Sequence, residues 1–158
     1  MKKALKITLI GLVAAFAVLQ FFRIDKTNPA VNAAETLDAA VKTPPDIQII
    51  LGRPCNDCHS NTTIYPWYAN IQPSAWYVKD HIDDGRRHLN FSTFNTYSLS
   101  KKQKKLAEIC EQVQSKDMPL PAYLWVHRDA VMQPGEAEAL CQWANTSIAM
   151  LERAGDTK

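Results

Sequence analysis

Two cysteines and a histidine lie within five residues in the first half of the chain. Cys55, Cys58 and His59 form a Cys-x-x-Cys-His pattern, which is the attachment pattern of a c-type haem. Two thiols at this spacing can bond the two vinyl groups on one edge of a porphyrin. The imidazole that follows then lies close enough to bind iron. The pattern predicts one covalent haem c attached through Cys55 and Cys58, with His59 as the proximal iron ligand.

Two other chemistries use a Cys-x-x-Cys pair. A redox dithiol usually follows a strand of a βαβ pattern, and no such pattern precedes Cys55. A zinc site would need Cys110 and Cys141 as its second half, but these two are not paired at short spacing. The sequence therefore favours haem over both a dithiol and zinc.

A methionine follows the helix that the sequence predicts over residues 99–115. Met118 is followed by Pro119 and Pro121, which force an extended loop. A thioether held on such a loop is a usual distal ligand of haem iron, so Met118 is the predicted distal ligand. The side chain could instead close the end of a helix as an apolar plug. His81 is the first alternative ligand, and the remaining candidates are His88, His127 and Met132.

Helical periodicity dominates the rest of the chain. Apolar residues recur at helical spacing over residues 46–53, 73–89, 99–115 and 134–153, and Gly85 interrupts the second of these segments. Ser100 is the expected N-cap of the third. Because there are no strand-like alternating segments and no internal repeats, we predict an all-α fold, a small cytochrome c-like domain built around the cofactor.

The N-terminus combines basic and apolar residues. Residues 7–22 are almost purely apolar and lie between Lys6 and Arg23. This pattern predicts a transmembrane helix whose N-terminus stays in the cytoplasm, with the domain on the periplasmic side of the inner membrane. A cleaved signal peptide is the alternative. The predicted organisation is an anchor over 1–23, a linker over 24–45, the haem domain over 46–153 and a disordered tail over 154–158.

Charge excludes one class of partner. The chain has 18 basic and 16 acidic residues, and four of the basic ones (Lys2, Lys3, Lys6 and Arg23) lie at the N-terminus. The remainder is therefore close to neutral, without a basic patch that would bind nucleic acid.

A longer run of residues carries a family resemblance. Residues 55–68, Cys-Asn-Asp-Cys-His-Ser-Asn-Thr-Thr-Ile-Tyr-Pro-Trp-Tyr, resemble a bacterial haem-binding domain family related to cytochrome c. The resemblance covers nearly all of residues 46–145. Further matching positions are Ile71, Pro73, Trp76, His81, Ile82, Gly85, Arg86, residues 89–92, Met118, Pro119, Leu120, Tyr123, His127, Ala130 and Trp143.

This resemblance implies an exported, membrane-anchored haem protein in which Cys55, Cys58 and His59 carry haem. Met118 falls on the family's Met-Pro position. Phe94 departs from the family, because a tryptophan is expected there.

Aromatic residues around the motif are pocket candidates. Tyr65 and Trp67 could cover a haem face and donate hydrogen bonds to propionates, although the same rings could equally fill the core. Trp76 and Arg86 complete the predicted pocket. Cys110 and Cys141 lie outside the family pattern and could form a disulfide or remain as two buried apolar side chains.

These observations lead to three functional hypotheses. The first is one-electron transfer by iron held between histidine and methionine, with an unidentified redox partner. The second is a haem-based sensor or ligand-binding module with a labile sixth site. The third is a peroxidase-like enzyme in which His81 or His127 would serve as acid and base.

Overall fold

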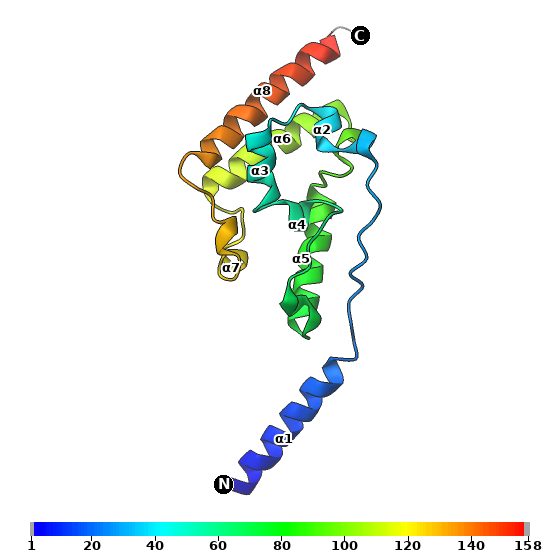
Figure 1. The fold of residues 1–158 in the computed structure, drawn as a ribbon, viewed down its shortest axis with the longest axis vertical. Coiled ribbons are helices and arrows are strands. Elements are labelled where there is room, and N and C mark those ends of the chain that lie inside the picture. The colour runs from blue at the N-terminus through cyan, green and yellow to red at the C-terminus, as the bar shows by residue number, and fades with distance from the viewer. Residues whose placement is uncertain (1, 157–158) are drawn as a thin grey trace.

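The fold is all-helical, as the sequence predicts. The computed structural model describes residues 2–156, and in this part of the chain it contains α-helices and short 3-10 helices but no strand (Figure 1). The α-helices are α1 (Lys2–Leu19), α2 (Leu37–Ala40), α3 (Pro45–Gly52), α4 (Asn56–His59), α5 (Ser74–His88), α6 (Leu99–Ser115), α7 (Pro121–Leu124) and α8 (Glu136–Asp156). The 3-10 helices are η1 (Ala33–Glu35), η2 (Trp67–Asn70), η3 (Phe94–Thr96) and η4 (Arg128–Ala130).

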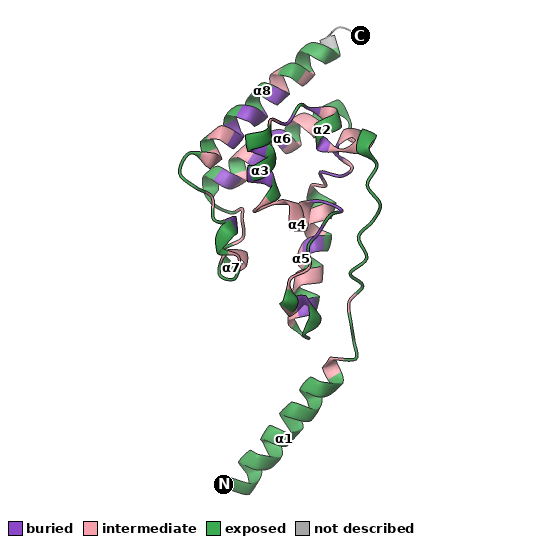
Figure 2. Cartoon of the chain, in the orientation of Figure 1, coloured by how far each residue is buried: buried purple, intermediate pink, exposed green. Residues whose placement is uncertain are grey.

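The two longest helices of the domain, α6 and α8, pack against each other and supply half of the buried residues in the core cluster. Leu106 of α6 and Leu140 and Ala144 of α8 are fully buried, and a disulfide joins Cys110 of α6 to Cys141 of α8. Figure 2 shows buried residues along α6, α8 and α3. The two cysteines therefore form a disulfide and are not separate buried thiols.

The bounds of α6 are those predicted, residues 99–115, but its N-cap is a different serine. The N-cap is Ser98, not Ser100, and its hydroxyl accepts a hydrogen bond from the Lys101 N–H at 3.4 Å. At the other end Lys116 adopts φ 64°. This left-handed residue turns the chain so that the N–H of Met118 donates to the Gln112 carbonyl at 3.1 Å. The helix end therefore fixes where Met118 leaves α6.

Gly85 does not interrupt α5, which runs unbroken to His88. A Cβ at Gly85 would lie 2.5 Å from the carbonyl oxygen of Cys58. The glycine therefore allows α5 to approach α4 closely at the cysteine motif.

The prediction of an N-terminal transmembrane helix is wrong. No helix among the described residues is long and apolar enough to cross a bilayer. The uncharged part of α1 begins after Lys6 and ends at Leu19, so at 1.5 Å per residue it measures about 20 Å, against about 30 Å of hydrocarbon. The predicted location, on the periplasmic side of the inner membrane with the N-terminus in the cytoplasm, depended on that helix and is not supported either.

The segment predicted as a linker packs along the domain. Leu37 and Val41 are each 5% exposed and belong to the core. The N–H of Leu37 donates to the Phe91 carbonyl at 2.7 Å, and the Asn28 side chain donates to the Thr63 carbonyl at 2.9 Å. At the other end of the chain α8 continues to Asp156 through part of the predicted tail, whose residues 157–158 lie outside the described part.

Candidate haem-binding site

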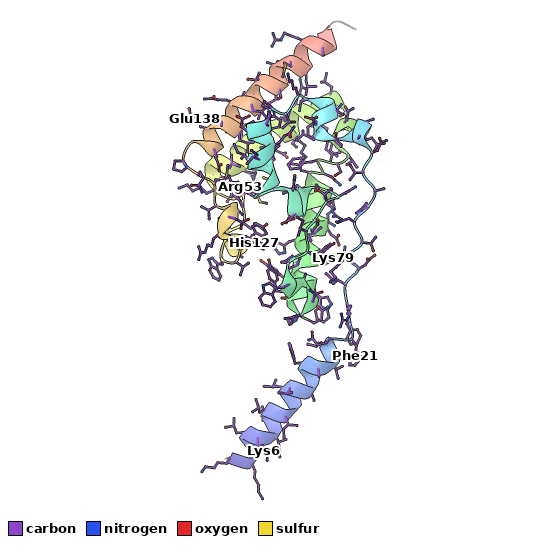
Figure 3. All side chains as sticks on the ribbon, in the orientation of Figure 1. Lys6, Phe21, Arg53, Lys79, His127 and Glu138 are labelled. Atoms are coloured by element: carbon purple, nitrogen blue, oxygen red, sulfur yellow. A yellow bond between two sulfur atoms is a disulfide. The ribbon has the colours of Figure 1, made fainter. Side chains whose placement is uncertain are left out.

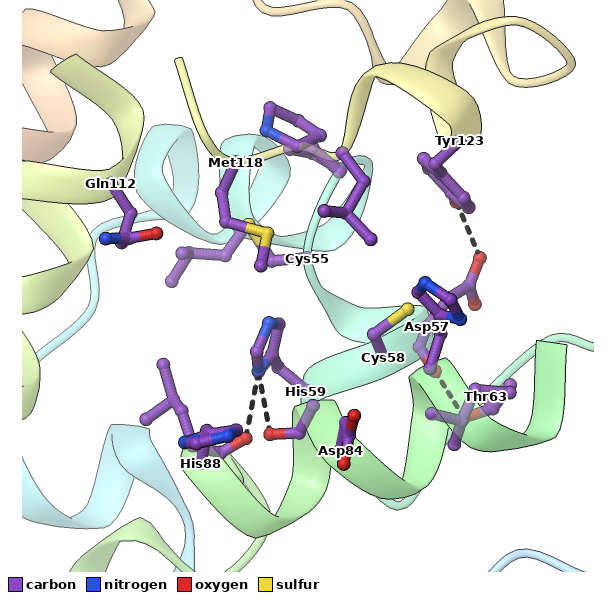
Figure 4. Close-up of a pocket in the computed structure, with 18 of the residues that line it drawn as sticks. Cys55, Asp57, Cys58, His59, Thr63, Asp84, His88, Gln112, Met118 and Tyr123 are labelled. Atoms are coloured by element: carbon purple, nitrogen blue, oxygen red, sulfur yellow. Dashed lines mark hydrogen bonds between the residues drawn. The ribbon is translucent and has the colours of Figure 1, made fainter. Parts of the chain in front are cut away.

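A cavity of about 680 Å³ lies next to the cysteine motif. Its walls come from α4, α5, α6 and the loop between α6 and α8 (Figure 4). Apolar side chains make up most of the lining, among them Ile82, Leu89, Phe91, Ile109 and Val113. Both the volume and the lining are typical of a site for a large apolar cofactor.

His59 stands at the end of α4 and points into this cavity (Figure 4). Its Nδ1 lies 3.1 Å from the Gly85 carbonyl oxygen and 3.0 Å from that of Leu89. Since both partners are acceptors, Nδ1 carries the proton and Nε2 keeps a free lone pair. Burial lowers the pKa of the imidazole, which favours its neutral form. This arrangement is the one that a metal-binding histidine requires.

Cys55 and Cys58 line the same cavity and are not bonded to each other. Burial raises the pKa of the Cys55 thiol to about 12 and that of Cys58 to about 11. Reactive dithiols have lowered thiol pKa values instead, so these two cysteines do not resemble a redox dithiol. The zinc alternative loses its second pair of ligands, because Cys110 and Cys141 are bonded to each other.

Met118 enters the cavity from the loop that follows α6. Figure 4 shows its side chain on the opposite side of the cavity from the helix on which His59 is held. The structure therefore brings together the four residues at the centre of the predicted site: Cys55, Cys58, His59 and Met118.

The family of the chain follows from a comparison with known families. The model of a family described as a haem-binding domain matches residues 14–146. The chain belongs to this haem-binding domain family. It is therefore a haem protein, and the resemblance noted in the sequence is confirmed. No curated protein and no solved structure matched the chain.

The residues around the cavity of this haem-binding domain fit a haem. The apolar walls match the porphyrin faces, and the Nε2 lone pair of His59 can bind iron. The neutral thiols of Cys55 and Cys58 line the same cavity. The donor set is thus nitrogen and sulfur, as haem proteins use.

Three aromatic residues and one arginine of the predicted pocket do not line the cavity. Trp67 is 74% exposed, and the indole N–H of Trp76 donates to the Phe22 carbonyl at 3.1 Å. The Tyr65 hydroxyl is buried without a hydrogen-bond partner in the structure. Arg86 donates to the Ser60 carbonyl at 2.8 Å and to the Thr63 hydroxyl at 2.9 Å. It therefore braces the chain that leaves the motif.

The alternative iron ligands occupy different positions. His81 and His88 of α5 and Met132 of the loop line the cavity. The Nδ1–H of His81 donates to the Tyr77 carbonyl at 2.8 Å, which leaves Nε2 free. His127 is absent from the lining, and its Nε2 lies 2.7 Å from the Tyr68 hydroxyl.

Sequence reasoning missed the polar residues of the cavity rim. Asp57, Tyr68 and Tyr123 line the cavity, and the Tyr123 hydroxyl donates to Asp57 Oδ2 at 3.0 Å. Tyr68 and Tyr123 stand at positions that match the family, but the resemblance did not indicate what either side chain does. Their partners are 59 and 66 residues away in the sequence, so only the folded chain reveals the contacts.

Proposed function

We propose that this haem-binding domain carries one haem c, attached to Cys55 and Cys58, and transfers single electrons. His59 and Met118 are the axial ligands in this proposal. The observation that supports it best is the orientation of His59. Its Nδ1–H is committed to the carbonyls of Gly85 and Leu89, and its ring faces the cavity that Met118 enters from the other side.

The bound haem would supply an iron that alternates between the ferric and ferrous states. The chain contributes a fixed ligand geometry and an apolar wall. Two carbonyls hold His59 in one tautomer, so little rearrangement accompanies a change of oxidation state. Apolar residues such as Ile82 and Ile109 exclude water. Together with a thioether ligand, this environment favours the ferrous form and a relatively high reduction potential.

The proposal is tested by absorption spectra and intact mass of protein matured in a host competent for covalent haem attachment. We expect the protein to weigh more than its polypeptide by one haem and to show Soret absorption. The Cys55→Ala/Cys58→Ala variant should lose the covalent haem. Unmodified wild-type protein without Soret absorption would disprove the proposal.

Met118 is tested through the weak long-wavelength absorption band that methionine ligation gives to ferric haem. Met118→Ala should abolish this band while the haem stays attached. Met132→Ala is the matched control, because Met132 lines the same cavity and should keep the band. If Met118→Ala retains the band and Met132→Ala loses it, Met132 is the ligand.

A haem-based ligand sensor is the second candidate function. It is favoured by the position of Met118 on a loop that side-chain hydrogen bonds connect to the opposite wall of the cavity. A peroxidase-like function would depend on His81, which lines the cavity with its Nε2 free. His127 is less suited to this role, because its Nε2 is engaged by the Tyr68 hydroxyl at 2.7 Å.

A further inference from the structure

The loop over residues 118–132, between α6 and α8, forms one wall of the cavity. It supplies Met118, Leu120, Tyr123, Val126 and Met132 to the lining. Short-range backbone bonds hold it in shape, such as His127 N–H to the Tyr123 carbonyl and Ala130 N–H to the His127 carbonyl, both at 3.1 Å. The loop is therefore a compact unit with its own internal order.

Both ends of this loop are fixed to the domain. At the beginning, the N–H of Met118 donates to the Gln112 carbonyl at the end of α6. Near the end, Arg53, which Figure 3 labels, donates from Nη1 to the Asp129 carbonyl at 2.9 Å and forms an ion pair with Glu136. The middle of the loop contains α7, and Figure 4 shows Tyr123 of α7 pointing toward Asp57 of α4.

Two hydrogen bonds connect this middle part to the opposite wall. The Tyr123 hydroxyl of α7 donates to Asp57 Oδ2 of α4 at 3.0 Å. His127 Nε2 lies 2.7 Å from the Tyr68 hydroxyl of η2. The rings of Tyr123 and His127 stack at 4.0 Å with an interplanar angle of 7°, so the two bonds act on one rigid aromatic pair.

The partners on the opposite wall are themselves held in place. Asp57 Oδ1 accepts the N–H of Ile64 at 2.9 Å, and Tyr68 lies in η2, where its ring meets His127 edge-on at 6.0 Å. Burial raises the pKa of both Tyr68 and Tyr123, which keeps both phenols protonated as donors. With Tyr68 as donor, His127 Nε2 is the acceptor.

The sequence positions of these residues connect them to the iron ligands. Asp57 immediately precedes Cys58 and His59, and Tyr123 follows Met118 by five residues. A bond between Asp57 and Tyr123 therefore joins the proximal motif directly to the loop that carries the distal methionine.

We propose that Tyr68, His127, Tyr123 and Asp57 form a latch that positions Met118 at the haem iron and restricts the entry of small ligands to the distal side. These are positioning residues, because they act through the loop. The inference rests on the proposed function, since it requires a bound haem whose distal side faces this loop. When the latch is weakened, the loop opens more often and a ligand such as carbon monoxide reaches iron faster.

The test uses the haem-loaded full chain and the variant Tyr68→Phe/Tyr123→Phe, which removes both hydroxyls and keeps both rings. Each lost hydrogen bond shifts an equilibrium by about two- to tenfold. We expect carbon monoxide to bind the ferrous haem about tenfold faster or more and the methionine band of the ferric form to weaken. The mass that the haem adds to the polypeptide should be the same as in the wild type.

Thr146→Val is the matched control. The Thr146 hydroxyl donates to the Gln142 carbonyl at 2.8 Å within α8, and neither residue lines the cavity, so the control loses one hydroxyl hydrogen bond without touching the latch. Its carbon monoxide rate should equal that of the wild type. Tyr123→Phe alone serves if the double variant does not fold, and it should give a smaller acceleration in the same direction.

The possible failures are distinguishable. Wild-type protein without attached haem would disprove the proposed function. Attached haem with equal carbon monoxide rates in the wild type and in the tyrosine variants would disprove the latch alone. That rate remains decisive even if the wild type shows no methionine band, because it measures access to the iron.

Discussion

At the residue scale, the orientation of His59 depends in part on Gly85. The Gly85 carbonyl is one of the two acceptors of the His59 Nδ1–H. The missing side chain of Gly85 also makes room for the Cys58 carbonyl, which would lie 2.5 Å from a Cβ at this position. The atom that it would meet belongs to the backbone, so no side-chain rotation can relieve the clash.

Gly85→Ala is therefore expected to push α5 away from α4. This movement should lengthen the hydrogen bond from His59 Nδ1–H to the carbonyl of residue 85. Overpacking of this kind costs about 1–3 kcal/mol, which should appear as a lower free energy of unfolding in urea. Haem incorporation, followed by Soret absorption, should fall as well.

Gly52→Ala is the control for this substitution. Gly52 ends α3, and the nearest atom to a Cβ there is Asn56 Nδ2 at 4.0 Å. Stability and haem content should both stay close to those of the wild type. Equal behaviour of the two alanine variants would contradict the close approach at Gly85.

At the element scale, α6 and α8 form the frame that supports the loop over residues 118–132. Cys110 and Cys141 join the two helices directly, and the loop leaves the end of α6 and returns at the start of α8. The disulfide therefore closes a segment that contains the whole loop over residues 118–132.

Replacement of both cysteines by alanine should lower the free energy of unfolding by about 3–4 kcal/mol, as the constraint on the unfolded chain is lost. The sequence separation of 31 residues sets this magnitude. Urea unfolding of the haem-loaded protein measures the effect. Reductant should destabilise the wild type and leave the alanine variant unchanged, and an unaffected wild type would contradict the prediction.

The helices were predictable from the sequence because their signals are local. The apolar spacing of α5, α6 and α8 and the motif at Cys55 each lie within one segment. The contact between Tyr68 and His127 spans 59 residues, so no local pattern could reveal it. The prediction that the N-terminal helix spans a membrane was wrong for another reason. Its composition resembles that of a membrane span, but the helix ends at Leu19 and includes Lys6.

At the scale of the whole molecule, the segment between α1 and α3 is part of the domain. Leu37 and Val41 enter the same core cluster as Phe91 and Phe94, and the carbonyl of Lys42 accepts the indole N–H of Trp143 at 3.1 Å. In contrast, the described residues of α1 include none that is buried (Figure 2). We therefore expect the folded unit to begin before α3, and α1 to contribute little to its stability.

A pair of leucine substitutions tests this boundary in the full-length chain. Leu37→Ala removes a side chain that is only 5% exposed, and such a cavity in the core costs about 2–5 kcal/mol. Leu9→Ala makes the same chemical change on α1, where the side chain is 60% exposed, and should shift stability by less than about 0.5 kcal/mol. Both values come from urea unfolding of the haem-loaded protein. If Leu37→Ala were as mild as Leu9→Ala, residues 24–45 would be a free linker and the folded unit would begin at α3.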